Sequence, residues 1–256
     1  MTVRTRSVGR ETRGPATIDD LAIDAGEDPP LEAYLVTHDA APGPAILCWH
    51  WFDTAADDSD RTQFLDEAVE LAGLGITSLL PQGRFPWSTP PTTAGADVAA
   101  IQAEVDRLHA GIEVLRATHG VDGSRIGLVG HDFGGMLAAV AAPDVEGLRA
   151  LVLIAATPRW GDWFLPFWPI PDDRLDYLRA LRPLDPIERV GQVRGASILF
   201  QFGRRDFFIA PMTGLEFKGG APEGADLLPY DDEHGMRDPA VRADRIAFLR
   251  RTLLPA

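Results

Sequence analysis

The sequence predicts an α/β fold in which a mostly parallel sheet of the eight-stranded type is flanked by helices. Two observations support this prediction: short apolar runs alternate with segments of helical periodicity, and polar residues of chemical interest come directly after the apolar runs. A chain of 256 residues can bury one large core, and no repeat or low-complexity linker divides it. We therefore expect a single domain over residues 1–256.

The first half of the chain predicts two antiparallel strands followed by strand–helix units. ATIDDLAID (16–24) and PLEAYLVTH (30–38) have the alternation of opening antiparallel strands, and PAILCWH (44–50) is apolar enough to be a buried strand. Residues 59–74 predict a helix with one apolar face, ended by a glycine at position 75. ITSLLPQ (76–82) is the next predicted strand.

The second half continues the same alternation. Residues 96–118 predict the clearest helix, because apolar residues recur there at spacings of four and three. A closing helix is expected to begin at Asp238-Pro239 and to run to about Leu254. The strands between these helices are predicted at residues 126–129, 148–156, 196–202 and 225–230.

The turn GHDFG after residues 126–129 has the layout of a nucleophile elbow, G-x-S-x-G, with Asp132 in place of the serine. A carboxylate at a helix N-terminus is stabilised as an anion and needs no base to act as a nucleophile. It can attack an sp³ carbon that carries a halide or a strained epoxide oxygen. Asp132 is therefore a candidate nucleophile that would form an alkyl ester.

Two further residues complete a candidate catalytic triad in the order nucleophile, acid, histidine. Asp206 ends ILFQFGRRD, and His234 follows the last predicted strand in PYDDEHGM. This order is that of α/β hydrolases, in which a histidine oriented by an acid activates water. Asp162 in RWGDW is the alternative acid, because it also follows a predicted strand.

Hydrolysis of an ester on Asp132 needs backbone donors for the oxyanion. The N–H of Phe133, directly after the nucleophile, is one expected donor. The second is expected from CWHWFD, from either Trp51 or Phe52. His50 borders the same substrate site and is expected to buttress this loop rather than to take part in the chemistry.

Residues 158–190 are rich in Trp, Phe and Pro and lie between two predicted core strands, which predicts a small lid inserted into the domain. Its aromatic side chains are either core or the walls of a pocket for a small apolar or aromatic substrate. The candidate wall residues are Trp160, Trp163, Phe167, Trp168 and Tyr177.

The motifs resemble two branches of the α/β-hydrolase superfamily. GHDFGG resembles the elbow of epoxide hydrolases and haloalkane dehalogenases, which use an aspartate nucleophile. The chain departs from both: dehalogenases usually have a tryptophan at the position of Phe133, and epoxide hydrolases two lid tyrosines where this lid has only Tyr177. LLPQGRFPW, DPIERVGQVRGASILFQFGRRD and EHGM resemble the dienelactone-hydrolase-like branch, which cleaves esters or lactones with Ser or Cys. In that branch an arginine at the position of Arg84 can hold a substrate carboxylate.

Three functions follow as hypotheses. The first is a hydrolase that opens an epoxide or displaces a halide through an alkyl ester on Asp132. The second is an ester or lactone hydrolase of the dienelactone-hydrolase-like type. The third is a protein that binds a small ligand or directs a cyclisation without hydrolysis.

The composition limits partners and location. A formal net charge of −14 argues against nucleic acid and anionic membranes as partners. The single cysteine fits a reducing compartment, and the N-terminal segment lacks the apolar core of a signal peptide, so we expect a soluble cytoplasmic protein. The DDEH stretch at His234 lacks a second group with ligand spacing, and we expect no metal and no cofactor. The sequence does not predict the oligomeric state.

Overall fold

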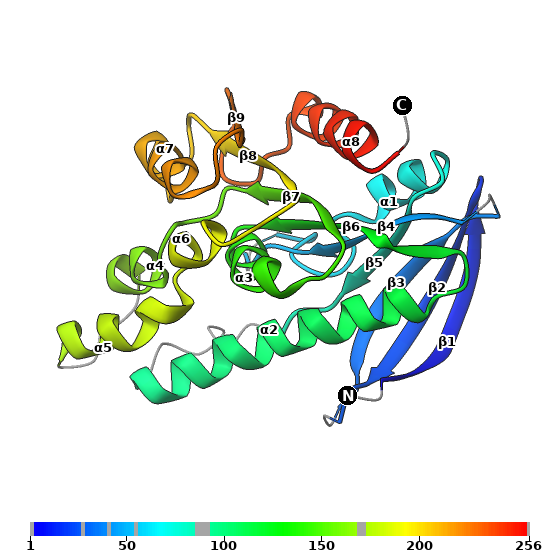
Figure 1. Cartoon of the computed structure of the whole chain (residues 1–256), viewed down its shortest axis with the longest axis horizontal. Helices are drawn as coiled ribbons and strands as arrows, with labels where there is room; N and C mark the ends of the chain where they lie inside the picture. The colour runs from blue at the N-terminus through cyan, green and yellow to red at the C-terminus, as the bar shows by residue number, and fades with distance from the viewer. Residues whose placement is uncertain are drawn as a thin grey trace.

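The described residues form one nine-stranded sheet in the order β1-β2-β3-β5-β4-β6-β7-β8-β9. The computed structural model describes residues 3–26, 29–39, 42–53, 56–84, 93–167 and 173–254. β1, β2, β3 and β5 pair antiparallel, and all pairs from β5 through β4 to β9 are parallel (Figure 1). The predicted α/β architecture with a mostly parallel sheet is confirmed.

Most strands lie where the apolar runs predict them. They are β1 (Arg4–Arg13), β2 (Ala16–Asp24), β3 (Leu31–Thr37), β4 (Gly43–Trp49), β5 (Thr77–Pro81), β6 (Val121–His131), β7 (Leu148–Ile154), β8 (Ser197–Gly203) and β9 (Asp226–Tyr230).

Eight of the nine strands in the described residues were predicted from the sequence, and β1 is the one that was not. All of its residues are exposed, and it pairs only with β2, through a hairpin turn at Gly14-Pro15. Gly14 has φ +56°, a backbone conformation that glycine adopts without a Cβ clash. An edge strand with no buried face has no apolar alternation, so its sequence does not have the usual pattern of a strand.

Two helical layers cover the sheet, with α2, α3, α5 and α6 on one face and α1 and α8 on the other (Figure 1).

The helix predicted over 59–74 is shorter, because residues 61–64 form turns in which the Asp60 carboxylate accepts the Thr62 N–H at 2.7 Å. The helices are α1 (Leu65–Ala72), α2 (Ala94–Ala117), α3 (Phe133–Ala141), α4 (Trp160–Phe167), α5 (Arg174–Leu181), α6 (Pro186–Val190), α7 (Pro211–Gly220) and α8 (Pro239–Leu253), with 3-10 turns η2 (Ala142–Asp144) and η3 (Arg182–Leu184).

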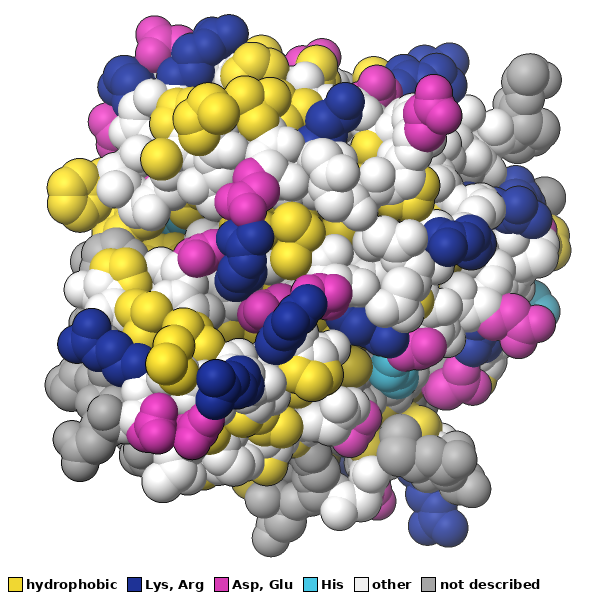
Figure 2. Space-filling model, turned by 60° about the vertical axis from the view of Figure 1, so that its left-hand side comes forward, with side chains coloured by type: hydrophobic (Ala, Val, Ile, Leu, Met, Phe, Trp, Pro, Cys, Tyr) yellow, Lys and Arg dark blue, Asp and Glu magenta, His cyan; other side chains and the backbone are white. Residues whose placement is uncertain are grey.

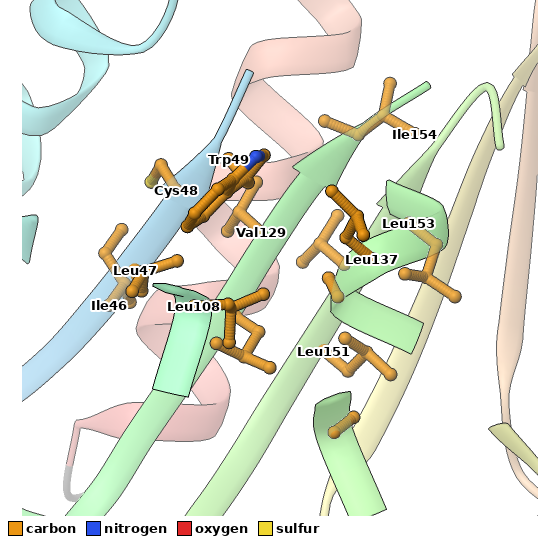
Figure 3. Packing of buried hydrophobic residues seen from close by; sticks show 14 of the residues in the cluster. Ile46, Leu47, Cys48, Trp49, Leu108, Val129, Leu137, Leu151, Leu153 and Ile154 are labelled. Carbon is orange, nitrogen blue, oxygen red and sulfur yellow. The ribbon is translucent and has the colours of Figure 1, made fainter. Parts of the chain in front are cut away.

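The core lies on both faces of the central strands, as Figure 3 shows for β4, β6 and β7. Every residue of β4 is buried. Leu108 of α2 and Leu137 of α3 pack on the sheet and are fully buried. Burial on two faces explains why these strands are continuous apolar runs rather than alternating ones.

The surface has charged side chains of both signs. On the face shown in Figure 2, Lys and Arg are interspersed with Asp and Glu, and hydrophobic side chains form patches between them. No helix within the described residues is long and apolar enough to cross a membrane.

A buried ion pair joins the helical layer of α1 and α8 to the sheet. The Arg245 guanidinium donates to both Glu67 carboxylate oxygens, at 2.8 Å from Nε and 2.5 Å from Nη2. Its Nη1 donates to Gln201 Oε1 on β8 at 3.0 Å. Arg245 and Glu67 are only 6% and 4% exposed, so each charge depends on the other.

We predict that Arg245→Met lowers the free energy of unfolding by about 3–5 kcal/mol, because the Glu67 carboxylate stays buried without its cation. Urea denaturation measures this loss. The double variant Glu67→Leu/Arg245→Met should recover most of it, since no unpaired charge remains. Equal losses in the single and double variants would contradict the prediction.

Candidate active site

The elbow between β6 and α3 fixes the position of Asp132. Asp132 has φ 54° and ψ −121°, a strained backbone conformation for a residue with a side chain. A Cβ on Gly130 would lie 2.2 Å from the Gly134 carbonyl oxygen, and one on Gly134 would lie 2.4 Å from that of Trp49. Only glycine fits at both positions, so the G-x-D-x-G pattern is a steric requirement of this turn.

The two oxygens of the buried Asp132 carboxylate have different surroundings. Oδ2 accepts the Phe52 N–H at 3.3 Å, and the Phe133 N–H also donates to this carboxylate. Oδ1 makes no hydrogen bond to a described residue and lies 3.7 Å from His234 Nε2. Burial raises the pKa of Asp132, although His234 and the two N–H groups oppose this.

His234 and Asp206 follow neighbouring strands, β9 and β8, and form a tight pair. His234 Nδ1 donates to Asp206 Oδ2 at 2.8 Å. Asp206 Oδ1 accepts the N–H groups of Phe208 and Ile209, which orients this carboxylate. Burial favours neutral His234, but the carboxylates of Asp132 and Asp206 outweigh it and raise the pKa of His234 to about 9.

The alternative acid, Asp162, is not at this site. It lies on α4, where its side chain is 38% exposed and 3.8 Å from the Arg159 guanidinium. Of the two candidate acids, the fold therefore brings Asp206 to the histidine. The reason is topological, because the loop after β8 is next to the loop after β9 at the carboxyl edge of the sheet.

The loop after β4, residues 50–53, is called the oxyanion loop. It offers one backbone N–H to Asp132, that of Phe52. The expectation that Trp51 could serve instead is wrong, because its N–H donates to Gln63 Oε1 at 2.9 Å. The Trp51 carbonyl accepts from His50 Nδ1 at 2.7 Å and from Ser59 Oγ at 3.3 Å.

His50 is a buttress of this loop, and the structure does not present it to a substrate. Its Nδ1 donates to the Trp51 carbonyl, and its Nε2 accepts the Gly83 N–H at 2.9 Å. Burial lowers the pKa of His50 to about 4 and keeps the ring neutral, as this bonding pattern requires. Both ring nitrogens are therefore used within the protein.

Two of the predicted wall residues use their polar groups for hydrogen bonds within the protein, one inside the lid and one from the lid to α2. Trp160 is fully buried, and its indole N–H donates to the Leu184 carbonyl at 2.6 Å. The Tyr177 hydroxyl donates to Asp97 Oδ2 on α2 at 2.8 Å. The interpretation of these two residues as pocket walls is therefore wrong, and they are structural.

Trp163 is the predicted wall residue that lies at the site. Its ring centroid is 5.2 Å from Phe133, 5.5 Å from Phe208 and 5.7 Å from His234. Phe167 ends α4 with its side chain outside the described part of the chain, and Trp168 lies outside the described residues.

Arg84 does not reach the reaction centre. Its guanidinium donates to the carbonyl groups of Pro29 and Pro30, the latter at 2.9 Å, in the segment before β3. Its backbone N–H donates to Glu104 on α2 at 3.2 Å. The expected role in holding a substrate carboxylate is therefore not supported by this geometry.

A cleft of about 870 Å³ lies against His234, between the loops after β4, β8 and β9. Its lining is both aromatic and charged, and five acidic residues against two arginines and the His234 imidazolium give a formal charge of −2. This differs from the apolar pocket that one of the two interpretations of the lid aromatics predicted. The residues are Trp51, Asp53, Ala56, Asp57, Asp58, Arg205, Phe207, Phe208, Asp232, Glu233, His234, Gly235 and Arg237.

No protein-family model matches the chain, and no curated protein matches it. Solved structures are similar in fold. Acetyl xylan esterase 1 from Thermoanaerobacterium sp. JW/SL YS485 superposes with a TM-score of 0.75 at 15% identity, covering 97% of this chain and 87% of that one. Acetyl xylan esterase from Paenibacillus sp. R4 gives 0.75 at 17% identity, with 98% and 89% covered. A protein assigned as a dienelactone hydrolase of Klebsiella pneumoniae gives 0.63 at 15%, with 98% and 100% covered.

The chain therefore has the α/β-hydrolase fold. Within this superfamily, the similar structures include the dienelactone-hydrolase-like branch that the sequence motifs resemble. Identity of 15–17% establishes the fold and not the reaction, so the chemistry has to be argued from Asp132 and its surroundings.

We predict that His234 makes the stability of the protein depend on pH. Its folded pKa of about 9 lies above the unfolded value of about 6.5, so its contribution is complete below about pH 6.5 and is lost as pH rises through about 9. Urea unfolding of the wild type and His234→Gln across this interval measures it. The difference between the two proteins should shrink with rising pH, and a constant difference would contradict the assignment.

Proposed function

We propose that the protein is a hydrolase in which Asp132 attacks an sp³ carbon and forms a covalent alkyl ester. The observation that supports this proposal is the unequal environment of the two Asp132 oxygens. Oδ2 accepts the Phe52 N–H, and the Phe133 N–H donates to the same carboxylate, whereas Oδ1 has no hydrogen bond within the described residues and faces His234. A carboxylate in that position already fills the oxyanion hole that a substrate carbonyl would need.

In the first step, an Oδ1 lone pair forms a bond to the substrate carbon. The bond from that carbon to the leaving group breaks, and its electron pair stays with the leaving group. An opened epoxide becomes an alkoxide, which takes the Nε2 proton of the His234 imidazolium. His234 is left neutral, the form needed for the next step.

In the second step, neutral His234 removes a proton from water, and the oxygen of that water attacks the carboxyl carbon of Asp132. Negative charge develops on Oδ2, where the N–H groups of Phe52 and Phe133 stabilise it. The bond from the carboxyl carbon to Oδ1 then breaks, Oδ1 takes the Nε2 proton of His234 and leaves as a hydroxyl of the product, and the new carboxyl group passes its remaining proton to His234. Asp132 keeps the oxygen from water, and Asp206 stabilises the imidazolium that forms.

Opening of an epoxide agrees better with the surroundings than displacement of a halide. The indole N–H groups of Trp51 and Trp160 are not available to a halide, because they donate to the carbonyl groups of Asp58 and Leu184. The Tyr177 hydroxyl is bonded to Asp97, so a lid tyrosine does not protonate the alkoxide. The imidazolium of His234 supplies that proton in our proposal, whereas a departing halide takes no proton, and His234 would have to release its proton to solvent before the second step.

Ester or lactone hydrolysis is the second candidate, and the structural comparisons favour it over alkyl transfer. The similar structures are named as acetyl xylan esterases and a dienelactone hydrolase. Attack of Asp132 on an acyl carbon would give a mixed anhydride, so in this mechanism Asp132 orients a water molecule that His234 deprotonates. The two mechanisms differ in whether a covalent adduct forms on Asp132.

We predict that His234→Gln accumulates the alkyl ester, because ring strain still drives the first step, with the alkoxide taking its proton from solvent, while the water for the second step is no longer activated. The variant is incubated with epoxides, haloalkanes, haloacids and esters, and intact mass and peptide mapping locate any adduct. A mass increase on Asp132 is expected with an epoxide. The double variant Asp132→Asn/His234→Gln is the matched control and should stay unmodified.

A single turnover of the wild type in ¹⁸O-labelled water gives an independent outcome. Alkyl transfer places the label in Asp132 and not in the product. Turnover of an ester with no adduct and with the label in the product would replace alkyl transfer with direct ester hydrolysis. No turnover and no adduct with any substrate would favour a protein that binds a ligand without hydrolysis.

The charge of the cleft leads to a prediction about substrates. A formal charge of −2 in the lining favours a cationic substrate over a neutral one of the same shape. Glycidyltrimethylammonium should therefore have a kcat/KM about tenfold higher than its neutral carbon isostere at low salt. The ratio should fall as salt screens the carboxylates, and a ratio of one at low salt would contradict the prediction.

A further inference from the structure

Gln63 is a polar residue just before α1 that touches two loops of the reaction centre, and no sequence motif marked it. Its Oε1 accepts the Trp51 N–H at 2.9 Å, and its Nε2 lies 2.6 Å from His131 Nδ1. On the other side of the ring, His131 Nε2 lies 2.8 Å from the His234 carbonyl oxygen. One side chain thus links the oxyanion loop, the elbow and the loop of the catalytic histidine.

The donor and the acceptor of each hydrogen bond in this series, which runs from Trp51 through Gln63 and His131 to the His234 carbonyl, are determined. A backbone N–H can only donate, so the Gln63 atom at Trp51 is the oxygen, and its amide nitrogen must donate to His131. His131 Nδ1 is then an acceptor, which places the ring proton on Nε2. The His234 carbonyl can only accept, so that proton satisfies the far end of the series. Burial lowers the pKa of His131 well below its usual value and keeps this tautomer neutral.

The Trp51 end of the series aims the oxyanion donor. The Trp51 N–H is held by Gln63, its carbonyl by His50 and Ser59, and the Asp53 N–H by Ser59 Oγ at 2.7 Å. These bonds fix the peptide groups on both sides of Phe52. The Phe52 N–H then points to Asp132 Oδ2.

The His131 end of the series positions the histidine loop. The bond from His131 Nε2 fixes the His234 carbonyl, while Asp206 fixes the ring of His234 through Nδ1. Trp51 stacks on His131 with ring centroids 5.1 Å apart and planes 3° from parallel. This contact holds the Trp51 and His131 ends of the hydrogen-bonded series at a fixed position relative to each other. The oxyanion donor and the catalytic base are thus positioned by the same connected group.

We propose that Gln63 is a positioning residue that sets the tautomer of His131 and aligns the Phe52 donor and His234 with Asp132. It touches none of the reacting atoms and acts through Trp51 and His131. The alignment of Phe52 and His234 rests on the proposed function for its catalytic consequence, whereas the tautomer of His131 does not.

The tautomer is measured by ¹⁵N NMR on the full-length wild type labelled at histidine. The spectrum of His131 should show a protonated Nε2 and an unprotonated Nδ1 at neutral pH. Gln63→Glu should convert His131 to an imidazolium, because the new carboxylate faces Nδ1 and can only accept. A protonated Nδ1 in the neutral wild-type ring would overturn the proposal without any variant.

The alignment is measured by steady-state kinetics. Gln63→Leu should lower kcat by at least about tenfold with little change in KM, because the donor and the base are displaced while the cleft is intact; loss of a whole oxyanion donor typically costs about 10²–10³. Gln63→Glu keeps the acceptor for Trp51 and should restore part of the rate. An unchanged kcat in Gln63→Leu would overturn the proposal.

Gln201→Leu is the matched control, because Gln201 also bridges two elements but contacts Arg245, Tyr230 and Val241 away from Asp132. It should lower stability and leave both the His131 spectrum and kcat unchanged. A fall in kcat equal to that of Gln63→Leu would attribute both effects to general loosening and overturn the proposal. If the spectrum is as expected but the wild type turns over no substrate, the proposed function fails and the tautomer assignment stands.

Discussion

The structure around the site depends on one constraint, a carboxylate held without solvent exposure at the end of β6. Asp132 is fully buried, and an unpaired buried carboxylate would be far too costly to keep ionised. His234 and the N–H groups of Phe52 and Phe133 provide the compensation. The strained backbone of the elbow and its close-packed glycines keep the carboxylate in this position. Phe52 in the loop after β4, Phe133 at the start of α3 and His234 in the loop after β9 each stabilise this charge.

The same compensation makes the site able to change its acid–base state during a reaction. In the resting site, two carboxylates flank His234 and favour its imidazolium form. In the proposed mechanism, forming an ester on Asp132 removes one of those charges, so the pKa of His234 falls when a base is needed. In that mechanism the Phe52 donor at Oδ2 needs no rearrangement between the resting carboxylate and the tetrahedral intermediate. A serine at this position would give neither effect, because it carries no charge to lose.

The sequence predicted what depends on the local chain and missed what depends on tertiary partners. Apolar runs and glycines located the central strands and the elbow, because burial on two faces and a steric turn are visible in the residues themselves. The choice of Phe52 over Trp51 depends on Gln63, twelve positions from Trp51 in the chain. The roles of Arg84 and Tyr177 depend on carbonyl groups 54–55 positions away and on Asp97, 80 positions away. No motif encodes such distant pairings.

The aromatic lid shows why residue type alone is a poor guide to substrate contact. Trp160 and Tyr177 each have a polar group that must be satisfied when buried, and Leu184 and Asp97 satisfy it. These bonds join Trp160 to η3 within the lid and Tyr177 of the lid to α2. Trp163 is the lid residue seen against Phe133, Phe208 and His234. The charged lining of the cleft comes instead from the loops after β4, β8 and β9. Within the described residues, differences in substrate choice are therefore expected to arise in these loops, which also hold the catalytic groups, rather than in the lid.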